Sequence, residues 1–208
     1  MKKNIERPLA QRRKAKQQRS LDRTQQIMQV TSQLLDEVGF DDLTTILITK
    51  RLGISVGSLY HYFPNKQAIL YAIAENWLKR WNRVLEDIST SPIEYDDLEG
   101  FVTTLNNTFL LVYREQKGIL PLIQAMYAVP ELRELDEQHD ITVTKYLSSF
   151  FKNIGVSQPP KARVRIASCY LEVVHAMLML VLEQSPANAK KTLSDLNTIC
   201  CRLLEKYL

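Results

Sequence analysis

The chain is poor in glycine and proline, with 6 Gly and 8 Pro among 208 residues. So few turn-forming residues exclude collagen and low-complexity disorder, and they disfavour a turn-rich β architecture. The three cysteines form no disulfide framework, so a reduced, cytoplasmic setting is expected. Long apolar runs are also absent. The longest, Ala176 to Leu182, is far short of the roughly 20 residues that span a bilayer. The basic N-terminus lacks an apolar stretch, which predicts no secretory signal peptide.

Charge is unevenly distributed along the chain. Residues 1–88 carry 15 Lys/Arg and 9 Asp/Glu, whereas residues 89–208 carry 12 and 14. Residues 1–23 alone hold nine basic and two acidic residues. A basic head on a mildly acidic body favours a polyanionic partner for the head. A solvated tail without a partner is the alternative, and charge alone does not decide between them.

Apolar residues recur at three- and four-residue spacing along most of the chain, which predicts an all-α fold. Gly, Pro and the candidate capping residues Asp22, Thr44 or Thr45, Ser55 and Asn65 divide the pattern into about nine helices. The expected spans are about 22–38, 45–52, 56–63, 66–87, 96–116, 121–128, 130–153, 161–183 and 187–207. Residues 1–21 are expected to form an arm outside the core, at most partly helical from Leu9 on.

The segment from Leu43 to Lys66 has the layout of a helix-turn-helix. Gly53 can adopt the left-handed conformation that tightens the turn, and Ser55 can cap the second helix. That helix starts with small residues that can approach DNA bases closely. Hydrogen-bonding aromatic residues follow them.

The order of these residues resembles the N-terminal domain of the TetR family of transcriptional regulators, whose pattern is roughly T-T-x-x-I-A-x-x-A-G-V-S-x-G-x-L-Y-x-Y-F-x-x-K. The matching residues are Thr44, Thr45, Ile48, Gly53, Ser55, Gly57, Leu59, Tyr60, Tyr62, Phe63 and Lys66. Leu34-Leu35 and Gly39-Phe40, at the end of the preceding helix, also match the family pattern. The resemblance therefore covers about residues 22–73. The chain departs from the pattern at Thr49 and Leu52, where Ala is commonest, and at Ile46 and Leu47, which are usually polar.

The resemblance implies a role for each matching position. Thr45, Ser55, Tyr62 and Lys66 would contact phosphates. Val56, Gly57, Ser58, Tyr60 and His61 would face the major groove. Leu59 and Phe63 are expected in the core. The implied organisation is a basic arm (1–21), a DNA-binding domain (22–65) and an effector-binding and dimerisation domain (66–208). The implied protein is a homodimeric repressor that binds a palindromic double-stranded DNA operator.

The helix at 161–183 is apolar nearly all round, and the last helix is similar. A surface helix needs only one apolar face, so both should be buried on several sides. The resemblance implies a four-helix bundle across a two-fold axis. The predicted interface residues are Val174, Leu178, Val181, Leu196, Ile199 and Leu203. An ordinary large core in a monomer is the alternative.

The family typically binds a small molecule among its middle helices, and the composition here suggests an apolar or aromatic effector. The candidate residues are Trp81, Phe109, Tyr113, Met126, Tyr127, Phe150, Tyr170 and Met177, although most such side chains are expected to be plain core. His175 is interpreted as a satisfied core histidine rather than a ligand contact.

Motifs for phosphate loops, nucleophile elbows and metal sites are absent from the sequence. We therefore predict no catalytic residues, no metal and no cofactor, and we expect His139-Asp140 to be solvated. The rival function is a basic helical module that binds an anionic membrane surface or a partner protein.

Overall fold

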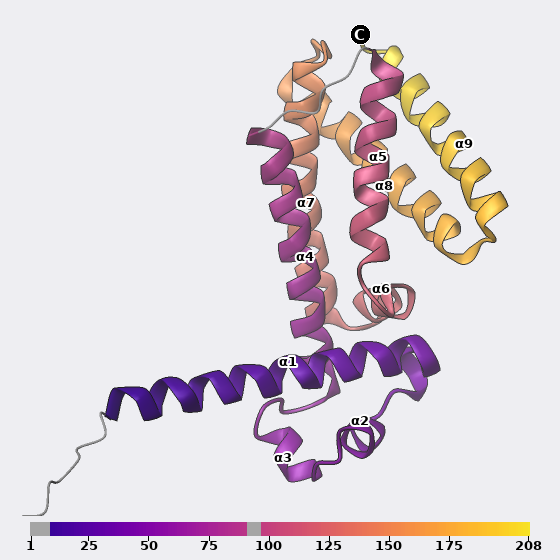
Figure 1. The fold of residues 1–208 in the computed structure, drawn as a ribbon. Helices are drawn as coiled ribbons and strands as arrows, with labels where there is room; N and C mark the ends of the chain where they lie inside the picture. Colours follow the sequence, from indigo (N-terminus) through magenta and orange to yellow (C-terminus); the bar gives the residue numbers. More distant parts are fainter. Residues whose placement is uncertain (1–8, 91–96) are drawn as a thin grey trace, which may run out of the picture.

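The computed structural model describes residues 9–90 and 97–208, with side chains described from residue 19 onward. Within these residues there are nine α-helices and no strand, which confirms the all-α prediction (Figure 1). The helices are α1 (Leu9–Asp42), α2 (Thr45–Leu52), α3 (Val56–Tyr60), α4 (Lys66–Thr90), α5 (Leu98–Arg114), α6 (Ile119–Ala128), α7 (Pro130–Asn153), α8 (Pro160–Glu183) and α9 (Pro186–Glu205). Residues 1–8 of the predicted arm, and the helix start predicted at Asp96, lie outside the described residues.

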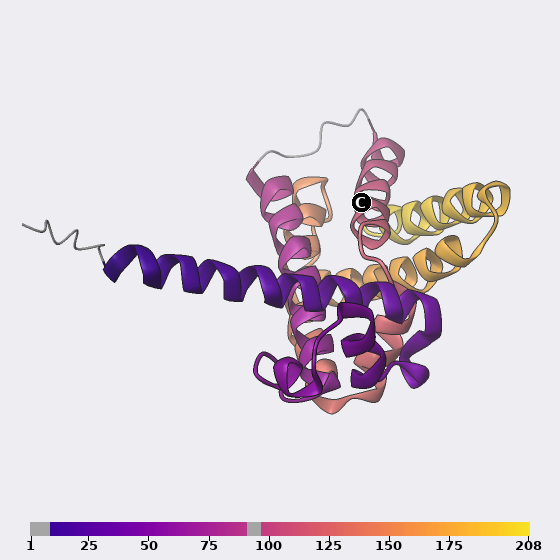
Figure 2. The same ribbon diagram turned by 60° about the horizontal axis from the view of Figure 1, so that its bottom comes forward.

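The first helix is longer than predicted. It begins at Leu9, so the predicted start at Asp22 is wrong. Residues 9–21 are mostly Ala, Gln, Arg, Lys and Leu, which all favour helix and therefore extend it. The N-terminal half of α1 projects away from the rest of the molecule (Figure 2). Near its other end, Gly39 interrupts the helical geometry with φ 78°, at the predicted stop.

A small core holds α1 to α4 together around the turn. Its fully buried side chains include Ile27 and Leu35 from α1, Ile48 from α2 and Leu59 from α3. Asn65 accepts a hydrogen bond from the backbone N–H of Ala68 at 2.8 Å and so starts α4 as predicted. The helix then leaves this core and runs upward into the rest of the molecule (Figure 1).

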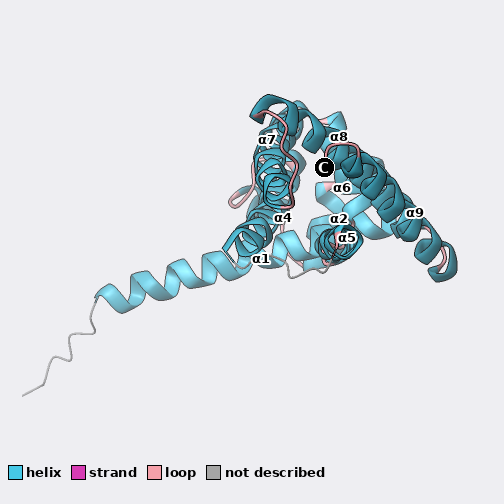
Figure 3. Ribbon diagram, turned by 90° about the horizontal axis from the view of Figure 1, so that it is seen from above, coloured by secondary structure: helices cyan, strands magenta, loops and turns pink. Residues whose placement is uncertain are grey.

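The larger body contains α4 to α9. Helix α7 packs against α4 and α8, while α9 packs on α8 and α5 at the side away from α4 (Figure 3). Helix α6 lies on α1 and joins the two parts. Of the described residues, only α8 forms a helix long and apolar enough to cross a membrane by length and composition, and it packs between α7 and α9.

Candidate nucleic-acid interface and internal cavity

The turn between α2 and α3 has the predicted capping geometry. The Thr44 hydroxyl accepts a hydrogen bond from the Leu47 N–H at 3.2 Å and caps α2. Gly53 closes α2 in the left-handed conformation, at φ 64° and ψ 35°. The Ser55 hydroxyl accepts from the Ser58 N–H at 3.1 Å and caps α3. These three local interactions fix the direction of α3 relative to α2.

Helix α3 divides cleanly between a buried side and an exposed side. Leu59 is fully buried and Phe63 nearly so, as predicted. The residues predicted to face the major groove, Val56, Gly57, Ser58, Tyr60 and His61, are all exposed. A Cβ placed on Gly57 would meet nothing closer than the Ser55 hydroxyl at 4.0 Å. The exposed side of α3 is therefore open to a close approach by a large partner.

The residues predicted to contact phosphates differ in their surroundings. Ser55 is exposed, whereas Thr45 and Tyr62 are half-buried. Lys66 donates a hydrogen bond to the Phe40 carbonyl at 3.1 Å, and its ammonium lies 4.6 Å from the centre of the Phe40 ring. This ammonium therefore already ties the start of α4 to the end of α1.

Helix α2 carries an apolar residue toward solvent. Ile46 is 68% exposed, at the slot that is usually polar in the resembled family. The Thr49 hydroxyl donates to the Ile46 carbonyl at 3.0 Å, so this polar departure from the family pattern is satisfied within α2. At the end of α2, Arg51 pairs with Glu37 of α1 at 2.7 Å on the surface.

A cavity of about 30 Å³ lies between α4, α5, α6, α7 and α8 in the body. Three aromatic rings form one wall: Trp77 and Trp81 of α4, and Tyr113 of α5. They meet edge to face, with ring centres 6.4 Å apart between the two tryptophans and 5.4 and 5.6 Å from Trp77 and Trp81 to Tyr113. The space suffices for about one water molecule, so any larger occupant must displace side chains or helices that line it.

His175 of α8 links this wall to α6 through hydrogen bonds. The Tyr113 hydroxyl lies 2.6 Å from Nδ1 of His175, and the Tyr127 hydroxyl lies 3.4 Å from Nε2. Burial lowers the pKa of His175, although the charge of Glu172 opposes the shift. A neutral imidazole has one donor and one acceptor nitrogen, so its two ring nitrogens can serve the two tyrosine hydroxyls in opposite roles. His175 is thus a satisfied histidine, as interpreted, but it also lines the cavity.

The opposite wall corrects a prediction. His139 and Asp140 of α7, expected in solvent, line the cavity together with Asp136. Burial, reinforced by neighbouring carboxylates, raises the pKa of Asp136 to about 6 and that of Asp140 to about 7. Burial lowers the pKa of His139 to about 4. Sequence reasoning missed these residues because α7 reads as a charged surface helix. The spacing of Asp136, Asp140 and Val143 on one helical face was the available signal.

Of the eight residues predicted to bind an effector, Trp81 and Tyr113 line the cavity. Phe109 supports Trp81 from behind, with ring centres 4.7 Å apart. Tyr170 is instead fully buried and donates to Asn106 at 2.8 Å. Met126, Tyr127, Phe150 and Met177 are not in the cavity lining, and Tyr127 is 56% exposed.

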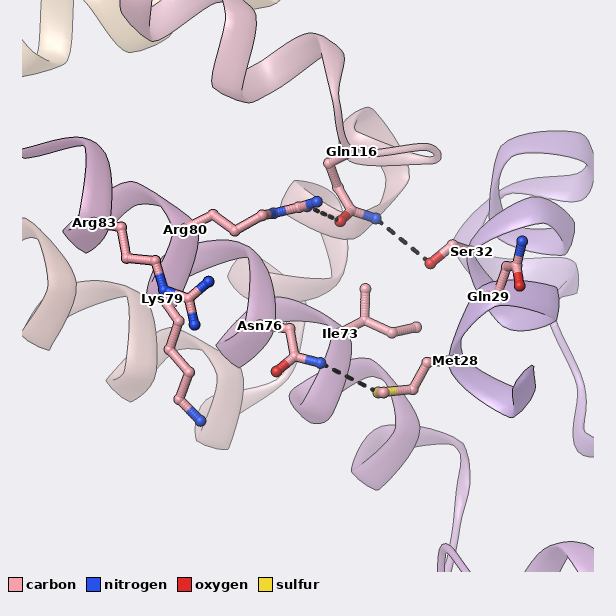
Figure 4. Close-up of a pocket in the computed structure, with 9 residues that line it drawn as sticks. All are labelled: Met28, Gln29, Ser32, Ile73, Asn76, Lys79, Arg80, Arg83 and Gln116. Carbon is pink, nitrogen blue, oxygen red and sulfur yellow. Dashed lines mark hydrogen bonds between the residues drawn. The ribbon is translucent and has the colours of Figure 1, made fainter. Parts of the chain in front are cut away.

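The face of α4 that points away from the cavity borders an open groove of about 340 Å³, and α1 lines the other side of this groove (Figure 4). Arg80 donates to the Gln116 side-chain oxygen at 2.7 Å, and the Gln116 amide donates to the Ser32 hydroxyl at 3.4 Å. Asn76 donates to the Met28 sulfur at 3.7 Å. One stretch of α4 therefore lines the cavity through its tryptophans and holds α1 through the residues beside them.

Two family models match this chain. Residues 27–73 match the model described as bacterial regulatory proteins of the tetR family, and residues 97–204 match a tetracyclin repressor-like C-terminal domain. The chain belongs to the TetR family. It is therefore a DNA-binding transcriptional regulator and not an enzyme, with its helix-turn-helix in α2 and α3.

TetR-family relatives and structures agree with this assignment. The chain is 30% identical over 115 residues to the tetracycline repressor protein class C of Escherichia coli, covering 54% of this chain and 49% of the relative. It is 29% identical over 116 residues to the nucleoid occlusion factor SlmA of Vibrio atlanticus, covering 53% and 55%. The matches thus span about half the length of these relatives. A transcriptional regulator from Rhodococcus sp. Rha1 has the same fold, with a TM-score of 0.70 over 88% of this chain and 96% of that one, at 17% identity.

The residues predicted at a TetR-type dimer interface divide into two groups. Val174, Leu178, Val181 and Leu196 are 0–3% exposed and pack inside the subunit, so they offer no surface to a partner. Ile199 is 45% exposed and Leu203 is half-buried. An apolar helix buried on several sides gives no indication of which stripe faces its own core, and four of the six predicted interface residues lie in the core of the subunit.

Proposed function

We propose that this TetR-family chain is a ligand-responsive repressor that acts in the cytoplasm and binds a palindromic operator as a homodimer. The observation that carries the proposal is the double role of α4. Trp77 and Trp81 line the cavity, while Asn76 and Arg80 on the same helical turns contact α1 or Gln116. An occupant that displaces α4 therefore also acts on the helix that holds the DNA-reading unit.

In this proposal the exposed side of α3 reads bases. Tyr60 is 49% exposed and Val56 38%. Ser58 and His61 carry groups that donate or accept hydrogen bonds at base edges. The Ser55 and Tyr62 hydroxyls would fix the register on the phosphates. Two such helices in a dimer would enter successive major grooves, ~34 Å apart or a little more.

The proposed dimer interface lies on the outer faces of α8 and α9. On α8, Cys169, Val173, Ala176 and Leu180 recur at three- and four-residue spacing and share one face. Leu180 is 49% exposed, and Ile199 of α9 is 45% exposed. Exposed apolar side chains gathered on two adjacent helices favour a partner that covers them.

The proposed switch follows from the small size of the cavity. Since the space holds about one water molecule, a larger effector must displace its lining, and the proposed switch is a movement of α4 away from α7 and α8. Such a ligand shifts the equilibrium between two states only by its differential affinity for them. The relative named as a tetracycline repressor supports repression released by a small molecule.

Affinity sequencing of genomic fragments with the purified protein tests this function. We expect one enriched motif with two-fold symmetry. His61→Ala should change the preferred bases at one position of each half-site, while Tyr62→Phe should weaken binding to all sequences alike. Failure to enrich any motif, or an enriched motif that lacks symmetry, would contradict the proposal.

A further inference from the structure

The cavity combines an aromatic wall with an acidic wall. Three aromatic rings meet edge to face on one side, and two carboxylic side chains lie on the other. Among the residues that the structure describes, neither Asp136 nor Asp140 has an ion pair, and no hydrogen bond reaches either carboxylate. Such half-buried carboxylates hold their protons to higher pH, in line with the raised pKa values of Asp136 and Asp140, and a bound cation would favour their charged form.

We propose that this cavity binds an organic monocation, with its charge beside Asp136 and Asp140 and its aromatic or apolar part against Trp77, Trp81 and Tyr113. The proposal deepens the proposed function, on which it rests, because it names the chemical class of the effector. The sequence alone predicted an apolar or aromatic effector; the carboxylates add a positive charge to that description.

The aromatic wall suits a cation because the face of each ring carries a negative quadrupole. Trp77 and Trp81 are 3% and 4% exposed, so a bound cation would be largely removed from water, where this attraction is strongest. Trp77 donates its ring N–H to the Val112 carbonyl at 3.3 Å, which holds the ring in place. Trp81 also meets the His139 ring edge to face at 6.1 Å.

The remaining titratable groups around the cavity do not neutralise the carboxylates. The lowered pKa values of His139 and His175 leave both imidazoles uncharged at neutral pH. Tyr113 and Tyr127 have raised pKa values and stay neutral. Glu137 and Glu172, on the exposed sides of α7 and α8, add negative charge and help to raise the pKa of Asp140. No Lys or Arg is among the described residues that line the cavity, so an anion would find no opposite charge there.

His139 adds a directional group to the site. Its Nδ1 is buried and has no hydrogen-bond partner among the described residues. A neutral imidazole can donate or accept at this atom. The site therefore suits a cation that also carries a hydroxyl or similar polar group on its apolar body.

A pair of matched probes tests the proposal. The cation (4-hydroxyphenyl)trimethylammonium and its neutral isostere 4-tert-butylphenol have nearly the same shape and differ by one charge. The chain contains only two tryptophans, and both line the cavity, so their fluorescence reports its occupancy directly. Calorimetric titration gives a second, independent readout.

We expect the wild-type protein to bind the cation at least about tenfold more tightly than the isostere, and Asp140→Asn and Asp136→Asn to remove most of that preference. Glu134→Gln, at an exposed position of α7, is the matched control and should keep it. Circular dichroism checks folding, and two separate aspartate variants guard against the loss of one. Equal or tighter binding of the isostere, binding of neither probe, or preference retained in both aspartate variants would each overturn the proposal.

Operator anisotropy measured in the same titrations separates this proposal from the one on which it rests. Cation binding that leaves operator affinity unchanged would count against ligand-responsive repression while the cation site stands. Release of the operator by the neutral isostere alone would support the response and overturn the cation site.

Discussion

Gly118 lies in close contact with the backbone of α1. Its φ is 67°, its N–H lies 3.2 Å from the Asp36 carboxylate, and a Cβ there would lie 2.9 Å from the Ser32 carbonyl oxygen. Gly53 has a similar φ of 64° but open space around it. A substitution at Gly53 therefore measures the free-energy cost of the left-handed backbone alone. The same substitution at Gly118 adds the cost of a steric clash with α1.

We predict that Gly118→Ala lowers the free energy of unfolding by about 2–4 kcal/mol, and Gly53→Ala by about 1 kcal/mol. The difference arises because only the first substitution also pushes against the α1 backbone. Denaturant unfolding followed by circular dichroism measures both. Equal losses would show that α1 and the α5–α6 turn separate easily.

The carboxylate of Asp140 makes stability depend on pH. Its pKa is raised from 3.8 to about 7, so its favourable contribution is complete below about pH 4 and is lost as pH rises through 7. His139, with its pKa lowered from 6.5 to about 4, acts in the opposite sense: its contribution is present above pH 6.5 and is lost as pH falls toward 4. Asp136, with its pKa raised to about 6, acts in the same sense as Asp140, so the two carboxylates outweigh His139 and the wild-type protein should lose stability as pH rises from about 4 to 7.

Asp140→Asn should remove part of this loss. Between pH 4 and 7 the stability of the variant relative to wild type should rise by about 1–2 kcal/mol, which is well below the full pKa shift because the carboxylate keeps some contact with solvent. Thermal melts at several pH values provide the measurement. A constant difference across this range would mean that the carboxylate is not desolvated.

At the scale of elements, local sequence signals predicted most of the fold. Thr44, Gly53, Ser55 and Asn65 act through neighbours within a few residues, and all four adopt the predicted capping or turn roles. The start of α1 was misplaced because Asp22 resembles a cap while the preceding residues favour helix just as strongly.

Non-local packing was harder to predict from the sequence. Which face of α7 points inward depends on α4 and α8, so His139 and Asp140 were expected in solvent. The same limit applies to α8, where Leu178 and Leu180 are equally apolar but only Leu178 is buried. A single helix does not reveal which of its apolar stripes meets the core.

The basic N-terminal half of α1 is the element whose role in DNA binding can be measured most simply. Residues 1–21 contain eight Lys/Arg and one acid. Each phosphate that they neutralise adds about −0.9 to the slope of log affinity against log salt. If two to four charges engage per subunit, deleting residues 1–21 should make the slope of a dimer shallower by roughly 4–7.

A second variant distinguishes charge from helix length in this experiment. Gln in place of Arg12, Arg13, Lys14 and Lys16 keeps strong helix formers and removes charge only. We expect it to reproduce most of the shallower slope. Identical slopes for wild type, deletion and Gln variant on one operator would show that this segment does not bind DNA.

At the scale of the whole molecule, the outer faces of α8 and α9 should hold two subunits together. Leu180→Glu combined with Ile199→Glu places charges on exposed positions, so the subunit should fold normally. In a dimer the same charges would be buried without partners, at a cost of about 3–5 kcal/mol. Light scattering should therefore report a helical monomer with weak affinity for the palindromic operator.

Leu178→Glu is the contrasting substitution. Leu178 is fully buried within the subunit, so this change should unfold the chain rather than dissociate it. A Leu180/Ile199 variant that stays dimeric would place the interface on another surface.

The central claim is that α3 of each subunit reads one major groove of a two-fold symmetric site. Methylation interference on the selected operator tests it most directly, because methylation at guanine N7 blocks the major groove alone. We predict interference at two symmetric positions, about one helical turn apart or a little more, with loss of the effect at one base of each half-site in His61→Ala. Interference at one half-site only, or none in the major groove of a tightly bound operator, would contradict the account.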